Sequence, residues 1–154
     1  MTRSVYGPSF RFGLERVRTV RKHGEQLAQQ ELAGAMGRRD DCEVEVRLAE
    51  QRAGGALASQ RTATERPLSA TELQSHQAWI ERTEQAHALV ADNLSRHERE
   101  VERRRGQLNA AAREKKALDR LEARRRREFD QATARAEMLV TDEVALNVFR
   151  GNAA

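Results

Sequence analysis

Residues 73–108 read LQSHQAWIERTEQAHALVADNLSRHEREVERRRGQL. A strict spacing of seven joins Leu73, Ile80, His87, Leu94, Val101 and Leu108. The positions between them are filled by Thr83, Val90, His97, Arg104, Ala111 and Leu118, and the pattern continues through Leu121, Arg125, Phe129, Ala132, Ala136 and Leu139. This long 3-4 repeat predicts an amphipathic helix that packs against a second helix along one seam.

A similar repeat occupies the preceding part of the chain. Its seam consists of Leu14, Val17, Val20, Gly24, Leu27 with Ala28, Leu32, Ala35, Arg39, Cys42, Val46, Ala49 and Ala53. Steps of three and four residues keep these side chains on one side of a helix. Ser9 can cap this helix at its start, where Phe10 opens it, and residues 1–8 are expected to form a loosely held lead.

A helix-breaking stretch separates the two repeats. Pro67 forces the residue before it towards extended geometry. Ser69, followed three residues later by Glu72, has the form of a capping box. We therefore predict an all-α fold, in which two long helices form an antiparallel coiled-coil hairpin and the second helix is the longer. The predicted bounds are 10–61 for the first helix, 62–70 for the turn and 71–150 for the second helix.

The composition excludes several classes of protein. Charged residues make up 34% of the chain and aromatic residues 4%, which is typical of a coiled coil. We expect one domain over residues 1–154, with a thin buried seam and no enclosed active site. The sequence has no phosphate-binding loop, no H-E-x-x-H motif and no paired cysteines, since Cys42 is the only one. We predict no enzymatic activity, no cofactor and no small-molecule substrate.

The four histidines do not predict a metal site. His87 and His97 fall on seam positions, where a polar side chain more often fixes the register of a coiled coil than binds a metal. The longest apolar runs are far shorter than the ~20 residues of a membrane span. We therefore expect a cytosolic protein without a bound metal.

The two helices differ in predicted length by about 40 Å, at about 1.5 Å per residue. Residues from about Arg124 onwards would therefore have no antiparallel partner. This overhang begins with Arg124, Arg125, Arg126 and Arg127 and ends with Leu139, Val140, Val144, Val148 and Phe149. Either a partner covers these apolar side chains, or the helix bends near Thr141 and folds back onto Phe10 and Phe12.

Residues 96–127 contain thirteen Arg or Lys and six Asp or Glu, a local excess of +7. Such a stretch can be a solvated helix face, a docking surface for an acidic protein or a phosphate-binding stripe. Stacking aromatic residues are missing and acidic residues are interleaved, so nucleic acid is the less favoured partner. Near the turn, Trp79 with Thr83, Ala86 and Val90 can cover the seam or anchor a partner.

Several motifs resemble those of the FliJ-type flagellar export proteins. The first is Phe10-Arg11-Phe12-Gly13-Leu14-Glu15-Arg16-Val17, continuing to Arg21, Glu25 and residues 29–33. The others are residues 113–122, residues 125–129 and the terminal Asp142-Glu143-Val144-Ala145. The resemblance covers nearly the whole chain in order and length.

The resemblance implies an antiparallel hairpin, similar to the central stalk of rotary ATP synthases, that inserts into the hexameric flagellar export ATPase. It further implies contact with the export gate membrane protein FlhA and escort of export chaperones. The ATPase would face Phe10 and Phe12 together with residues 124–149, above all Arg124, Arg125, Arg126, Arg127, Leu139, Val140 and Phe149. The gate would face Trp79, Thr83, Ala86 and Val90.

Three functions remain open at this point. The first is a non-enzymatic stalk and adaptor of the flagellar type III export apparatus, held at the inner face of the cell membrane by that apparatus. The second is the equivalent stalk of a virulence type III secretion system, which shares the hairpin. The third is an unrelated basic coiled coil that binds nucleic acid, which the +7 excess motivates.

Overall fold

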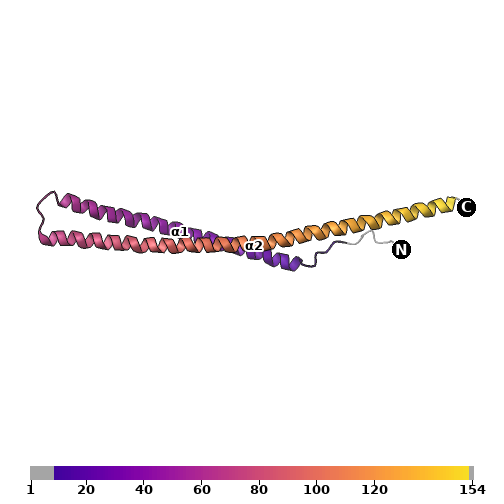
Figure 1. Cartoon of the computed structure of the whole chain (residues 1–154), viewed down its shortest axis with the longest axis horizontal. Helices are drawn as coiled ribbons and strands as arrows, with labels where there is room; N and C mark the ends of the chain where they lie inside the picture. The colour runs from indigo at the N-terminus through magenta and orange to yellow at the C-terminus, as the bar shows by residue number, and fades with distance from the viewer. Residues whose placement is uncertain (1–8, 153–154) are drawn as a thin grey trace, which may run out of the picture. The chain divides into compact units, whose positions relative to one another are not determined.

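The computed structural model describes residues 9–152, and over these residues it consists of two α-helices (Figure 1). Helix α1, Glu15–Ala63, has 49 residues, and helix α2, Ala70–Asn152, has 83. The predicted antiparallel hairpin with a longer second helix is confirmed. The lead predicted over residues 1–8 lies outside the described residues.

Helix α1 begins at Glu15 and not at Phe10, where the sequence placed its start. The first turn is closed by the amide of Glu15, which donates to the carbonyl oxygen of Phe12 at 3.1 Å. Gly13 lies inside this turn and has a low helix propensity. The remaining helix ends differ from their predicted positions by one or two residues, as ends commonly do.

The predicted capping box at the start of α2 is confirmed. The hydroxyl of Ser69 accepts from the amide of Glu72 at 3.2 Å, and the Glu72 carboxylate accepts from both the amide and the hydroxyl of Ser69 at 2.9 Å. Arg66 donates to the same carboxylate at 2.8 Å. These hydrogen bonds, chiefly the one from the Ser69 amide, lower the pKa of Glu72 from 4.5 to about 2.

The chain divides into two compact units. The hairpin unit comprises residues 26–110 and includes the connector between the helices. The terminal unit comprises, among the described residues, 9–25 and 111–152. The single domain expected from the sequence stays a prediction.

The core of the hairpin unit is a column of small side chains on α1. Ala35, Cys42, Ala49 and Ala56 recur every seven residues and are between 0% and 7% exposed. Small side chains at a helix contact let two helix axes approach closely. From α2, Val101 is buried with 5% exposure, and the Cys42 thiol donates to the Val90 carbonyl oxygen at 3.8 Å. Burial raises the pKa of that thiol.

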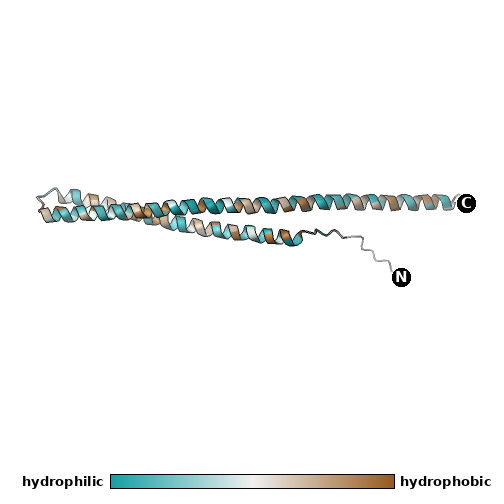
Figure 2. Ribbon diagram, turned by 60° about the horizontal axis from the view of Figure 1, so that its bottom comes forward, coloured by the Kyte–Doolittle hydropathy of each residue, from teal (hydrophilic) through white to brown (hydrophobic). Residues whose placement is uncertain are grey.

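Half-buried side chains flank this column. On α1 they include Leu32, Arg39, Val46 and Ala53, and on α2 they include Ile80, Thr83, His87, Val90, Leu94, His97, Arg104 and Leu108. Figure 2 accordingly shows apolar residues interspersed with hydrophilic ones along both helices. Arg104 links the two helices by an ion pair to Glu31 at 2.5 Å. The charged end of Arg104 thus finds an acidic partner on the facing helix.

The seam predicted for the first part of α1 is wrong by one residue. Val17, Val20 and Leu27 are 43%, 68% and 46% exposed, whereas Arg18 and Glu25 are half-buried. The seven-residue repeat of the half-buried Leu32, Arg39, Val46 and Ala53, continued backwards, passes through the positions of these two charged residues. A shift of one residue rotates a side chain by about 100° around the helix, which turns the valines and the leucine to solvent.

Two ends of the predicted seam also differ. Leu73 is 44% exposed, because it lies in the first turn of α2 beside the connector. Ala56 is completely buried, although the predicted seam stopped at Ala53. The buried repeat on α1 therefore extends further towards the turn than the predicted seam did.

Candidate partner-binding surfaces

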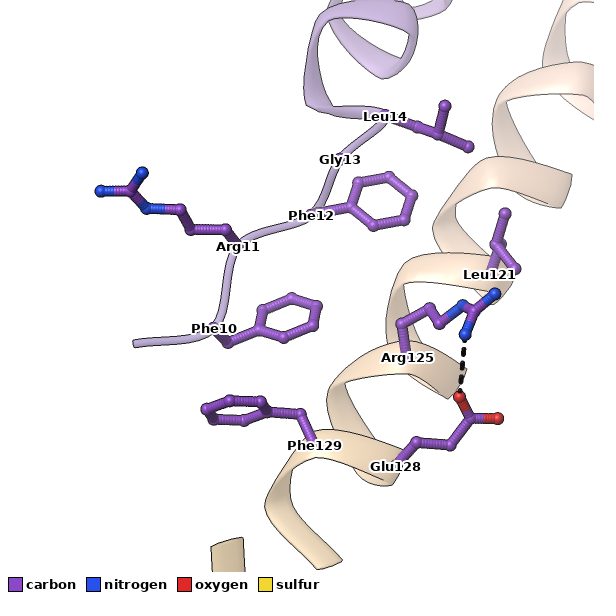
Figure 3. A pocket seen from close by; sticks show the side chains of 9 residues that line it. All are labelled: Phe10, Arg11, Phe12, Gly13, Leu14, Leu121, Arg125, Glu128 and Phe129. Atoms are coloured by element: carbon purple, nitrogen blue, oxygen red, sulfur yellow. Dashed lines mark hydrogen bonds and ion pairs between the residues drawn. The ribbon is translucent and has the colours of Figure 1, made fainter. Parts of the chain in front are cut away.

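Residues 9–14 form a non-helical segment that contacts α2 within the terminal unit. In Figure 3 the side chains of Phe10, Phe12 and Leu14 point towards α2, whereas Arg11 points away from it. The Phe10 and Phe129 ring centroids are 5.6 Å apart with an interplanar angle of 56°. Aromatic pairs favour such tilted arrangements over a face-to-face stack. The paired phenylalanines of the sequence therefore extend the coverage of α2 beyond the start of α1.

The guanidinium of Arg126 lies 5.9 Å from the centroid of the Phe10 ring. A cation at this distance over a ring face is attracted by the ring's electrons. Arg126 and Phe10 were both predicted to contact the same partner, and the structure brings these two side chains together. Their role in binding stays a prediction.

A groove of about 630 Å³ lies between the N-terminal segment and α2 (Figure 3). Its lining consists of Phe10, Arg11, Phe12, Gly13, Leu14, Leu121, Arg125, Glu128 and Phe129. Leu121 and Phe129 were both predicted to lie on the seam. Phe129 falls within residues 124–149, which were predicted to face the ATPase, but it was not singled out, and Leu121 lay outside that surface. The available signal for this part of the groove was Phe129, a large aromatic residue on the seam of α2 that lies beyond the start of α1.

Ion pairs hold the start of α1 against α2 in the terminal unit. Arg18 contacts Asp119 at 2.9 Å and Glu122 at 3.1 Å. Lys115 contacts Glu25 at 2.7 Å. The hydrogen bond to Asp119 raises the pKa of Arg18, and the hydrogen bond to Glu25 raises the pKa of Lys115. Charge pairs thus take the place of the apolar seam predicted here.

The last part of α2 has almost no cover. All side chains from Asp130 to Gly151 are exposed except Thr133, which is half-buried. We call residues 130–151 the uncovered segment. Its large apolar side chains are 56% to 75% exposed and comprise Met138, Leu139, Val140, Val144, Leu146, Val148 and Phe149. Exposed apolar surface of this extent makes the segment a candidate interaction site. Its role in binding stays a prediction.

Two expectations for this overhang need correction. The uncovered part begins after Phe129 and not at Arg124, because the N-terminal segment reaches Phe129. The helix also does not bend near Thr141, since α2 is continuous to Asn152. Of the two alternatives, folding back onto Phe10 and Phe12 is therefore not the arrangement of the structure.

The four consecutive arginines point in different directions around α2. Arg124 and Arg125 contact Glu128 at 2.9 and 3.5 Å. Arg126 lies over Phe10, and the Nε of Arg127 donates to the Ala123 carbonyl oxygen at 3.2 Å. They therefore do not form one cationic patch, although the sequence groups them.

The four residues predicted to face the export gate do not share one exposed face. Trp79 is 43% exposed and Ala86 is exposed, but Thr83 and Val90 are half-buried on the seam of the hairpin unit. The Thr83 hydroxyl donates to the carbonyl oxygens of Trp79 and Ile80 at 3.1 and 2.9 Å. The gate-binding role of the four residues stays a prediction.

Trp79 also lines a shallow groove on α2 with Thr71, Glu72, Ser75 and His76, of about 320 Å³. The hydroxyl of Ser75 donates to the carbonyl oxygen of Thr71 at 2.9 Å. This groove contains the only tryptophan of the chain. A partner can reach the indole ring from this side. This fits the position of Trp79 in the sequence, one step off the predicted seam.

Ion pairs account for much of the basic stretch over residues 96–127. Arg96 pairs with Asp92 at 2.6 Å, and Arg105 pairs with Glu102 at 2.5 Å. Arg103 and Arg104 both donate to Glu100, and these bonds lower the pKa of Glu100. A stretch whose charges are paired locally is weakly suited to follow a phosphate backbone.

The described residues contain neither a cluster of metal ligands nor a membrane span. Over residues 9–152 no group of three or more His, Cys, Asp or Glu side chains is arranged to hold a metal ion. Neither helix, as far as the structure describes it, contains a stretch long and apolar enough to cross a membrane. The candidate surfaces are therefore the terminal-unit groove, the uncovered segment and the Trp79 groove.

Residues 10–154 match the protein family described as "Flagellar FliJ protein". The match starts at the first phenylalanine of the N-terminal segment and includes the whole of the uncovered segment. No curated protein matches the chain, and no solved structure matches it.

Proposed function

Because the chain belongs to the FliJ family of flagellar proteins, whose role is a non-catalytic one in flagellar export, we propose that it is a stalk and adaptor of the export apparatus. In this proposal it binds the hexameric export ATPase and the gate protein FlhA and escorts export chaperones. It would work at the inner face of the cell membrane. The flagellar family match favours this role over that of a virulence-type stalk.

The uncovered segment is the observation that carries the ATPase part of the proposal. Successive helix residues are rotated by about 100°, so the apolar side chains of residues 138–149 are distributed around the helix. Among these residues only Asp142 and Glu143 carry a charge. A helix that is apolar on all sides is normally buried on all sides. A ring that encloses the segment satisfies this requirement better than one flat surface.

The terminal-unit groove supports a second contact with the same ATPase. It exposes apolar surface of Phe10, Phe12 and Phe129 beside the start of the uncovered segment within the terminal unit. Arg11 and Arg125 lie at the same groove and favour an acidic rim on the partner. The two surfaces together would offer an ATPase subunit both an apolar anchor and a charged edge.

Mixing the chain with the matching export ATPase tests this part of the proposal. Wild-type chain should bind the ATPase, promote ring formation and raise ATP hydrolysis. The double variant Leu139→Asp with Phe149→Asp should bind roughly 30-fold more weakly or worse, since hot-spot side chains contribute about 2 kcal/mol or more. Sedimentation with and without the ATPase measures both binding and ring assembly.

Leu89→Asp is the matched control, because Leu89 is 64% exposed on α2 in the hairpin unit. It should bind the ATPase like wild type. Absence of binding by wild-type chain, with both proteins folded, would contradict the proposed function. Equal binding by the double variant and the control would contradict the assignment of the uncovered segment.

The exposed indole of Trp79 supports the gate part of the proposal. Aromatic residues with free surface are over-represented among binding hot spots, and the Trp79 groove lies beside the capping box at the start of α2. Trp79→Ala should weaken binding to FlhA and leave ATPase binding unchanged. Leu57→Ala, at a 38% exposed site of α1, serves as the control. Unchanged FlhA binding by Trp79→Ala would remove Trp79 from the gate surface.

A further inference from the structure

Four cations of the terminal unit form a line along one face of α2. Arg113, Lys116, Arg120 and Arg127 are spaced by three, four and seven residues, and all four are exposed. This spacing keeps side chains on one face of a helix. The line spans about 21 Å at about 1.5 Å per residue. We call these four residues the cationic stripe.

The cationic stripe has no carboxylate partner among the residues that the structure describes. Other cations of the terminal unit do have one, for example Arg18 with Asp119 and Lys115 with Glu25. No carboxylate over residues 9–152 forms an ion pair with Arg113, Lys116 or Arg120, and the side chain of Arg127 bonds only to a backbone oxygen. Four like charges on one face repel one another, which an external anion relieves.

The stripe lies on the side of α2 away from α1. The seam positions Leu118, Glu122 and Phe129 are half-buried, and at about 100° per residue the stripe is on roughly the opposite side of the helix. A partner that approaches this part of α2 therefore meets the cations first. No described residue of the terminal unit needs to move to expose them.

The same face continues as apolar surface in the uncovered segment. Ala134 follows Arg127 by seven residues, and Met138, Ala145 and Phe149 continue with steps of four, seven and four. The side chains of Met138 and Phe149 are 68% and 75% exposed. A partner lying along this face would therefore contact cations over residues 113–127 and apolar side chains over residues 134–149.

We propose that the cationic stripe docks an acidic protein surface, and that this surface belongs to the same partner that encloses the uncovered segment. This inference rests on the proposed ATPase-binding function and adds the chemistry of the partner. The partner should carry carboxylates beside the apolar surface that encloses the uncovered segment. Carboxylates spaced by three or four residues on a helix would match the stripe. Their attraction to the four cations would set the orientation of the chain and speed its encounter.

Other anionic partners fit the stripe less well. A phosphate backbone can pair with the cations, but it offers no apolar surface to Met138 and Phe149, and the stripe has no aromatic residue for base stacking. A helix that lies in a membrane surface needs large apolar side chains beside its cations. Between Arg113 and Arg127 the residues that adjoin the stripe on its face are Ala117, Ala123 and Arg124, and none of them is a large apolar side chain.

The test compares the triple charge reversal Arg113→Glu, Lys116→Glu, Arg120→Glu with a control of equal net charge. The control is Arg47→Glu, Arg52→Glu, Arg82→Glu, because these three residues are exposed in the hairpin unit and form no ion pair among the described residues. Circular dichroism checks that both variants keep the helical content of wild type. Binding to the matching export ATPase is then titrated at several salt concentrations.

The triple reversal should bind the ATPase at least about tenfold more weakly than wild type at low salt, and its binding should depend less steeply on salt. The control should retain wild-type affinity. Equal affinities of the triple reversal and the control would overturn the inference while leaving the proposed function in place. Failure of wild type to bind the ATPase would overturn the proposed function, and the inference with it.

Two further arms identify a different anion. Vesicles containing anionic lipid and a duplex DNA fragment are titrated with wild type and with the triple reversal. Neither should bind wild type appreciably at physiological salt. The inference would be overturned if wild type binds the vesicles or the DNA, the triple reversal abolishes that binding, and the triple reversal still binds the ATPase like wild type. The stripe would then be assigned to a membrane or to nucleic acid.

Discussion

The seam of the hairpin unit and the uncovered segment use apolar residues in opposite ways. In the seam the buried side chains are small and repeat every seven residues, as Ala35, Cys42, Ala49 and Ala56. In residues 138–149 the apolar side chains are large, surround the helix and are more than half exposed. Burial, and not apolar content, therefore distinguishes a surface that holds the chain together from one that is available to a partner.

Hydrogen exchange should show the largest difference between the two regions. Opening free energies range from about 0 at fraying ends to the global value in packed cores. Amides of residues 35–56 should therefore exchange far more slowly than those of residues 130–151. Adding the export ATPase should protect the second set and leave the first unchanged. Equal protection of the two sets in the free chain would contradict the comparison.

Overpacking provides the next largest difference. Ala56→Leu introduces a large side chain at a completely buried position and should lower the free energy of unfolding by about 1–3 kcal/mol. Ala136→Leu is the matched change at an exposed position of the uncovered segment, and it should change that free energy by no more than about 0.5 kcal/mol. Urea denaturation of both variants measures the two values, and equal losses would contradict the assigned seam.

The smallest effect concerns the capping box beside the seam. Glu72 has a lowered pKa of about 2 against an ordinary value of 4.5, so its contribution to stability is complete above pH 4.5. That contribution is lost as the pH falls towards 2, when the folded-state carboxylate takes up its proton. A titration of the Glu72 carboxyl group followed by NMR should give the lowered pKa.

Ser69→Ala removes the hydroxyl hydrogen bond to the Glu72 carboxylate, which is one of the three that lower this pKa, and leaves the Ser69 amide and Arg66 as donors. It also removes the bond that the hydroxyl accepts from the Glu72 amide. The pKa of Glu72 should then rise towards 4.5, and unfolding should become easier by about 1 kcal/mol. Thr141→Ala is the control in the uncovered segment, where the Thr141 hydroxyl donates to the Glu137 carbonyl oxygen. A wild-type pKa of Glu72 near 4.5 would show that the capping box is not formed in solution.

The two helices and the capping box were predictable from the sequence because their signals are local. Pro67, Ser69 and Glu72 act within one turn of the chain, and a 3-4 repeat is visible without knowledge of what packs on it. The phase of the seam in α1 was missed because Val17 and Val20 are apolar and Arg18 is not. An arginine on a seam becomes acceptable only when acidic partners such as Asp119 lie on the facing helix.

The candidate surfaces were predictable in part for the same reason. Phe10 and the apolar residues after Leu139 are conspicuous in the sequence, whereas Thr83 and Val90 look equally available and are half-buried on the seam. Among the basic residues, the excess of charge is visible in the sequence, but which cations lack a carboxylate partner is not. That distinction depends on which carboxylates face each arginine across the hairpin.

The class of fold, the order and approximate ends of the helices and the greater length of α2 follow from the amino-acid sequence, because backbone hydrogen bonding and side-chain periodicity are local properties. The buried face of α1, the coverage of α2 by the N-terminal segment and the cations of the terminal unit without a carboxylate partner emerge only when the helices are packed. These depend on the rotation of one helix against another, and a turn of 100° exchanges the buried and exposed sets.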